Sequence, residues 1–181
     1  MIVAAGDTTL YHASYTAIEK IDLAKCRKRN DFGQGFYLTT DKQQAMRFVK
    51  TAIKKTGKNL DTGFVNTYTL NMAGLKIYEF VTTNHEWLHC VCDHRRFDIS
   101  EPRIAVWDAY DILAGKIAND DTMTVINIYI AGGYGDYGSE NAIHTAITLL
   151  KPERLKDQLC IRTQGAVEKL RFEGCFEVQV K

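Results

Sequence analysis

The sequence predicts a single α+β domain. Its 181 residues are enough for one domain with a substantial core, and 45% of them are hydrophobic and 25% charged, as in ordinary globular proteins. Short strand-like and helix-like segments are mixed without a regular βαβ rhythm. No repeat, low-complexity segment or proline-rich linker divides the chain, which contains two prolines. We therefore expect one domain that spans residues 1–181.

The first third of the chain contains one well-marked helix and three shorter elements. We expect a strand at Leu10–Ala13, a short helix at Ala17–Leu23 and a strand at Gly35–Thr39, whose aromatic and β-branched residues favour extended structure. Thr40 and Gln43 form a capping box that starts the main helix. The apolar side chains of this helix recur at helical spacing: Ala45, Phe48, Val49, Ala52 and Ile53.

The rest of the chain alternates between the two types of element. The patterns predict strands at residues 65–70, 110–117, 159–163 and 175–180, and helices at residues 86–96, 140–150 and 164–170. The segment Asp121–Ile130 fits both types. Its isoleucines alternate as in a strand, whereas Val125, Ile128 and Tyr129 also suit one face of a helix.

Charge and cysteine usage limit the class of protein. The net charge of +1 argues against nucleic-acid binding through a large basic surface. The basic run from Lys25 to Arg29 fits either a solvated loop or a landing site for phosphate. The first ten residues lack the features of a signal peptide, and no segment is apolar enough to span a membrane. Five cysteines then indicate reduced thiols, so we expect a cytoplasmic protein without a membrane partner.

The segment His85-Glu86-Trp87-Leu88-His89 matches the H-E-x-x-H signature of zinc hydrolases. In a helix, both histidines would share a face with charged residues, while Trp87 and Leu88 lie on the other side. We interpret this pattern as a surface helix and expect no bound metal. A zinc hydrolase built on His85, Glu86 and His89 remains the less favoured alternative.

Two other short motifs lack the context that their chemistry requires. Gly133–Gly138 matches G-x-G-x-x-G, but only 43 residues follow it, too few for a dinucleotide-binding fold. We interpret it as a flexible loop that borders a site. Asp31-Phe32-Gly33 resembles the metal-binding triplet of kinases, yet no H-R-D loop precedes it.

The first half of the chain carries a resemblance to a known superfamily. A histidine near a strand end, in Tyr11-His12-Ala13-Ser14, precedes Asp31-Phe32-Gly33-Gln34-Gly35-Phe36-Tyr37-Leu38-Thr39, and Phe48 follows on the next helix. This order resembles the ADP-ribosyltransferases, especially the diphtheria-toxin and poly(ADP-ribose) polymerase branch. It is also similar to small bacterial domains that carry Y-H-G-S, D-F-G-x-G-F-Y-L-T and a later D-Q pair. The resemblance implies two small sheets that form an NAD⁺ cleft with flanking helices.

The resemblance also assigns roles to single residues. It implies that Tyr37 and Phe48 stack on nicotinamide, that His12 hydrogen-bonds a ribose hydroxyl, and that the backbone of Ala13 grips the carboxamide. Gln158 takes the third catalytic position, where the superfamily usually has Glu. The implied NAD⁺-binding set is completed by neighbours of these residues: Ser14, Gly35 and Phe36.

Several of these assignments have alternatives. His12 also fits a buried histidine that is satisfied by a neighbour. Asn119 and Asp120 fit either a helix cap or a contact to the ribose or acceptor. Gln158 can hydrogen-bond but cannot supply negative charge to an oxocarbenium-like transition state.

We therefore expect a mono-ADP-ribosyltransferase, an NAD⁺-dependent glycosyltransferase that releases nicotinamide. The alternative is a module that binds NAD⁺ or ADP-ribose without catalysis. The sequence leaves open whether the acceptor is a protein, a nucleic acid, a small molecule or water, and does not define the oligomeric state.

Overall fold

The computed structural model describes residues 6–96, 101–117, 120–151 and 155–180. These residues form two β-sheets and six α-helices, so the α+β class is confirmed. The strands are β1 (Asp7–Ser14), β2 (Phe36–Leu38), β3 (Thr62–Asn71), β4 (Ile77–Glu79), β5 (Ile112–Lys116), β6 (Asp157–Ile161) and β7 (Leu170–Gln179). The helices are α1 (Lys42–Lys54), α2 (His85–Arg95), α3 (Glu101–Ala105), α4 (Asp120–Ile130), α5 (Glu140–Leu150) and α6 (Gln164–Glu168), with two 3₁₀ turns, η1 (Leu23–Lys25) and η2 (Val106–Ala109).

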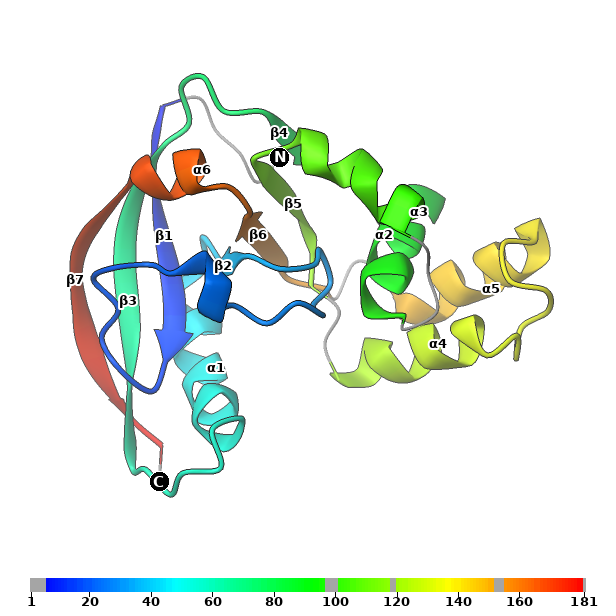
Figure 1. The fold of residues 1–181 in the computed structure, drawn as a ribbon. Coiled ribbons are helices and arrows are strands. Elements are labelled where there is room, and N and C mark those ends of the chain that lie inside the picture. The colour runs from blue at the N-terminus through cyan, green and yellow to red at the C-terminus, as the bar shows by residue number, and fades with distance from the viewer. Residues whose placement is uncertain (1–5, 97–100, 118–119, 152–154, 181) are drawn as a thin grey trace.

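The two sheets differ in size and direction. The first is antiparallel, with the strand order β1-β3-β7. The second has the order β2-β6-β5-β4, in which only the β4–β5 pair is parallel. Figure 1 shows the first sheet on one side of the molecule and helices α2, α4 and α5 beyond the second sheet on the opposite side.

One short contact joins the sheets directly. Tyr11 of β1 exchanges two backbone hydrogen bonds with Thr39, just after β2, at 2.8 and 3.0 Å. A shared apolar core lies beside this contact and includes Leu10, Tyr68 and Ile161 from three different strands. The contact places the end of β1 next to β2.

Helix α1 packs against the first sheet. Its buried residues Ala45, Val49 and Ile53 contact Ala13 of β1 and Val65 of β3. The predicted capping box is wrong by one residue, because the side chain of Asp41 accepts the hydrogen bond from the backbone of Gln44, at 3.0 Å. The carboxylate also suits the positive end of the helix dipole.

The predicted solvated face of helix α2 is only partly exposed. His85 is exposed and Glu86 is half-buried, whereas Asp93 is buried and His89 contacts another helix. His89 forms a 2.9 Å hydrogen bond with the hydroxyl of Tyr129 on α4. Asp93 is 5% exposed, accepts a hydrogen bond from Tyr137 at 3.1 Å and pairs with Arg103 at 3.4 Å. These partners satisfy polar groups that periodicity alone assigns to solvent.

Two further segments resolve questions that the pattern raised. Residues 120–130 form helix α4, which settles the ambiguous segment. The predicted helix at residues 17–23 is absent, and the chain there forms an irregular loop that leads into η1 at Leu23. The backbone N–H of Ile18 donates to the side chain of Asn66 at 2.8 Å, and its carbonyl accepts from Tyr68 at 2.6 Å.

Within the described chain, no helix has the length and apolar character that a membrane span requires.

Candidate functional site

A cleft of about 1480 Å³, here called the central cleft, lies between the sheets and helix α1. Segments far apart in the sequence line it, and they include four predicted site residues: His12, Tyr37, Phe48 and Gln158. The three predicted catalytic residues and the second aromatic residue therefore line one cleft.

The central cleft opens where β1 and β2 separate. The two segments are paired at Tyr11 and Thr39, and antiparallel continuation would place Ala13 opposite Tyr37. β1 instead diverges, so this edge of β1 faces the cleft. The backbone of a strand repeats its direction every two residues, so the N–H and C=O of Ala13 point the same way as those of Tyr11. Ala13 thus offers a donor and an acceptor to the cleft through its backbone.

His12 spans the gap between the two strands. Its Nδ1 donates a 2.7 Å hydrogen bond to the backbone carbonyl of Tyr37, because a carbonyl oxygen can only accept. Its ring stacks on Phe36 with centroids 4.2 Å apart. Burial lowers the pKa of His12, although the hydrogen bond to Tyr37 acts in the opposite direction. The neutral ring therefore carries a lone pair on Nε2, which can accept a hydrogen bond from a hydroxyl group.

The hydroxyl of Tyr37 is anchored in the turn that precedes β2. It accepts from the backbone N–H of Phe32 at 2.9 Å and donates to the carbonyl of Gly33 at 2.8 Å. Burial is the largest cause of a strongly raised pKa for Tyr37, so the phenol stays protonated. With its hydroxyl held in this way, the aromatic ring is the part of Tyr37 available to a ligand.

Gly35 and Phe36 support the site from behind. A Cβ at Gly35 would lie 2.4 Å from the Sγ of Cys160 and 2.6 Å from the carbonyl of Ile161, so only glycine permits this approach to β6. Phe36 is 5% exposed and contacts Tyr68 edge-on, with centroids 5.6 Å apart. Both residues border the cleft, but their main contacts position His12 and Tyr37.

Ser14 shapes the loop at the mouth of the cleft. Its hydroxyl accepts a 3.3 Å hydrogen bond from the backbone of Thr16, and the residue is 5% exposed. The buried side chain of Asn66 donates weakly to the carbonyls of His12 and Thr16, at 3.4 Å each. This bonding maintains the turn in which β1 leaves the sheet.

Phe48 lies on the surface of α1 that faces the cleft. Its side chain is 38% exposed, although neighbouring Val49 is fully buried in the core. The ammonium group of Lys55 lies 4.9 Å from the centroid of the Phe48 ring, which keeps this end of the cleft positive. An exposed aromatic ring beside a cleft is a ready surface for a flat ligand.

Gln158 is tied to an acidic residue that the sequence analysis did not select. Its Nε2 group donates to a carboxylate oxygen of Asp31 at 2.7 Å and to the carbonyl of Lys116 at 3.3 Å. These bonds use both N–H groups, so the Oε1 atom remains to accept from a ligand. Neighbouring Asp157 points elsewhere and pairs with Lys116 at 2.8 Å.

Asp31 and Arg95 form a buried ion pair at the wall of the central cleft. The Nε of Arg95 lies 2.8 Å from a carboxylate oxygen of Asp31, and a second guanidinium nitrogen contacts the same oxygen. The side chain of Asp31 is 4% exposed and that of Arg95 is 25% exposed. The pair joins residues 64 positions apart, and no local pattern could have indicated it. The only feature of the sequence that could have pointed to Asp31 as a site residue is its position directly before the turn at Phe32-Gly33.

The rim of the central cleft is rich in positive charge. Within the described lining, eight lysine and arginine residues face three acidic residues. Several of the basic side chains come from the run that the sequence analysis interpreted as either a solvated loop or a phosphate site, namely Lys25, Arg27 and Arg29. A positive rim of this kind favours anionic ligands.

Some predicted residues do not join the cleft. Asn119 lies outside the described residues, and so does the side chain of Asp120, the first residue of α4. The glycine-rich loop at residues 131–138 connects α4 to α5, contributes no residue to the cleft and lies at the far end of the helical pair in Figure 1. It does not border the central cleft, and its predicted position beside a site stays a prediction.

His85 and Glu86 also lie outside the cleft lining, and His89 is engaged with Tyr129. Among the residues that the structure describes, no group of three or more His, Cys, Asp or Glu side chains is arranged to hold a metal ion. The five cysteines, all of which are described, are unpaired thiols.

A family model described as "Protein of unknown function (DUF3990)" matches residues 8–172. This match covers most of the chain, which therefore belongs to that family. No curated protein and no solved structure matches the chain.

Proposed function

We propose that this member of the DUF3990 family is a mono-ADP-ribosyltransferase that uses NAD⁺ as its substrate. The observation that carries the proposal is the convergence of His12, Tyr37, Phe48 and Gln158 on the central cleft. These are the residues to which the resemblance to ADP-ribosyltransferases assigns NAD⁺ binding and catalysis. The cleft between two small sheets is also the architecture that the resemblance implies.

The nicotinamide end of NAD⁺ would lie between the separated strands. The rings of Tyr37 and Phe48 supply aromatic surfaces for a flat cationic ring. The outward N–H and C=O of Ala13 suit the carboxamide, which has one acceptor and two donors. Since these are backbone groups, the alanine in place of the usual glycine does not remove them.

The ribose would be held by two acceptors. The lone pair on His12 Nε2 and the Oε1 atom of Gln158 each suit a hydroxyl donor, because the donors of both side chains are engaged within the protein. The basic rim, which includes Arg27 and Arg29, would attract the pyrophosphate.

Asp31 supplies the charge that Gln158 lacks. Cleavage breaks the bond between the ribose C1′ and the nicotinamide nitrogen, and the electron pair leaves with neutral nicotinamide. The ribosyl cation is then captured by a lone pair of the acceptor, which loses its proton to solvent. A carboxylate hydrogen-bonded to Gln158 polarises the amide, making Oε1 a better partner for the positive ribosyl group. Arg95 balances part of that charge.

Nicotinamide release by purified variants tests this function. We expect His12→Ala and Tyr37→Ala to lower NAD⁺ turnover by about a hundredfold or more, because each removes a positioning contact. His144→Ala, on the exposed face of α5, is the control and should keep wild-type turnover. Unchanged turnover in both cleft variants would refute the assignment.

A module that binds NAD⁺ or ADP-ribose without catalysis is the second candidate. The feature that favours it is Gln158, which cannot carry negative charge itself. This candidate predicts saturable NAD⁺ binding that depends on Tyr37, with no nicotinamide released.

A further inference from the structure

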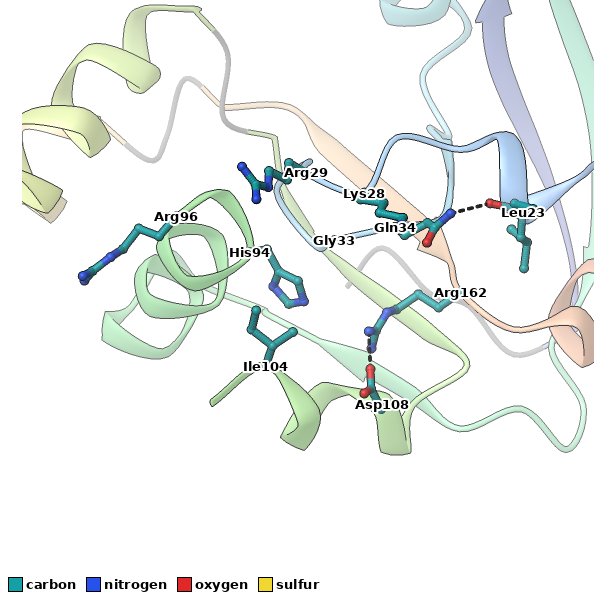
Figure 2. Close-up of a pocket in the computed structure, with 11 residues that line it drawn as sticks. Leu23, Lys28, Arg29, Gly33, Gln34, His94, Arg96, Ile104, Asp108 and Arg162 are labelled. Atoms are coloured by element: carbon teal, nitrogen blue, oxygen red, sulfur yellow. Dashed lines mark hydrogen bonds and ion pairs between the residues drawn. The ribbon is translucent and has the colours of Figure 1, made fainter. Parts of the chain in front are cut away.

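A second pocket lies on the opposite side of the turn that carries Asp31. Its volume is about 740 Å³, within the range of small-molecule sites. It is bounded by the turn, by α2, by the segment of α3 and η2, and by the residue that follows β6 (Figure 2). The residues that carry the argument are Lys28, Arg29, Gly33, His94, Asp108 and Arg162.

The second pocket is strongly basic. In its described lining, four basic residues face one carboxylate, that of Asp108. Figure 2 shows Arg96 directed away from the others, and its guanidinium lies 4.6 Å from the ring centroid of Tyr137. Lys28, Arg29 and Arg162 also line the pocket, and Arg162 pairs with Asp108 at 2.7 Å. Such an excess favours an anion.

His94 presents an unmatched hydrogen-bond acceptor at the wall of this pocket. Its Nδ1 donates to the carbonyl of Cys90 at 2.8 Å, and therefore carries the ring proton. Burial is the main cause of a lowered pKa for His94, and the charge of Arg162 acts in the same direction. The neutral Nε2 thus carries a lone pair, and no described residue donates to it. The residue is 6% exposed.

Arg162 presents an unmatched donor beside it. Its two terminal nitrogens are occupied by the carbonyl of Trp107 and, at 2.7 Å, by the carboxylate of Asp108. Its Nε is buried, and it lacks an acceptor in the described part of the chain. In Figure 2 the guanidinium group points toward Asp108, and the imidazole of His94, which lines the same pocket, lies to its side below Gly33. Buried polar atoms without partners are uncommon, and two together indicate a ligand that supplies both.

We propose that the second pocket binds a small phosphate-bearing molecule. A phosphate oxygen accepts from the Nε of Arg162, and a hydroxyl group of the phosphate, or of an attached sugar, donates to the Nε2 of His94. Both nitrogens are inaccessible to solvent, and the His94 ring packs against Gly33, so binding requires a displacement of the turn at Gly33. Lys28 and Arg29 balance the charge. This site is distinct from the central cleft, although Arg29 lines both, and the proposal does not depend on NAD⁺ chemistry.

Titration of the full chain with inorganic phosphate tests the proposal. The readout is the ¹⁵N shift of the His94 imidazole, assigned by its loss in His94→Asn. We expect a saturable shift, with affinity reduced roughly fivefold in Lys28→Ala. Lys25→Ala is the matched control, since Lys25 belongs to the same basic loop but lines only the central cleft.

Sulfate separates the role of His94 from simple charge attraction. Sulfate is similar in size and charge but has no proton to donate at neutral pH, so we expect it to bind at least about tenfold more weakly than phosphate. Sulfate binding as tight as phosphate binding would contradict the acceptor role of His94. The absence of a saturable His94 shift would overturn the site. Weakening by Lys25→Ala with no effect of Lys28→Ala would place the phosphate in the central cleft instead.

Discussion

Asp31 is the residue whose surroundings most constrain the chemistry of the central cleft. Its carboxylate is nearly inaccessible to solvent, is paired with Arg95 and accepts a hydrogen bond from Gln158. Burying a charge in this way is costly unless every partner is present. The arrangement therefore couples the stability of the turn before β2 to the group that we propose to polarise Gln158.

We expect Asp31→Asn to lower the free energy of unfolding by about 3 kcal/mol, because it leaves the guanidinium of Arg95 without its counter-charge. Urea denaturation at neutral pH measures this change. Glu173→Gln is the matched control, since it breaks an exposed ion pair with Arg171 and should have no measurable effect. Equal stability of Asp31→Asn and the wild type would show that the buried pair is not needed.

The strands and helices follow from local patterns more closely than the site does. Alternation and helical spacing predicted β3, α5 and most other elements, because each buries one face. The helix expected at residues 17–23 does not form, because long-range hydrogen bonds with the side chains of Asn66 and Tyr68 hold the backbone of Ile18 in a loop. The hydrogen bonds of the polar face of α2 were also missed, because Tyr129 on α4 and Tyr137 in the loop after α4 are about 40 positions away.

In the candidate site, too, residues in a local motif could be predicted from the sequence, whereas residues defined by long-range contacts could not. His12, Tyr37 and Phe48 could be selected from the sequence because they belong to a compact motif with a known resemblance. Asp31 was not selected, although it stands in the same motif, because its partners Arg95 and Gln158 are 64 and 127 positions away. Contacts of that separation depend on the topology of the sheets and have no local signature.

The approach of β2 to β6 depends on one glycine. We expect Gly35→Ala to destabilise the protein by about 2 kcal/mol or more, because its Cβ would overlap Cys160 and Ile161. Gly165→Ala, in helix α6, is the control. No atom lies within 4 Å of its added Cβ, and alanine favours helix, so stability should rise slightly. Thermal unfolding measures the stability of both variants. Similar changes in stability for Gly35→Ala and Gly165→Ala would contradict the close contact of β2 with β6.

For the molecule as a whole, buried histidines should make stability depend on pH. Burial is the largest cause of lowered pKa values for His12, His89 and His94, whose ordinary value is 6.5. Below pH 6.5 the unfolded chain binds protons that the native histidines resist, so the free energy of unfolding should fall as the pH drops from 7.5 to 5.5. Asp41 and Asp111 have pKa values lowered from 3.8, so their contribution is lost only at more acidic pH. Urea midpoints that stay constant over this range would contradict the prediction.

The central claim is that the cleft between the two sheets binds NAD⁺ and cleaves it. The most direct measurement is the melting temperature of the full chain with and without NAD⁺, followed by a nicotinamide assay on the same sample. NAD⁺ at a hundredfold excess over Kd should stabilise the native state by about 2.7 kcal/mol, which raises the melting temperature, and nicotinamide should accumulate. A shift without nicotinamide would identify a binding module, whereas no shift and no nicotinamide would contradict the account.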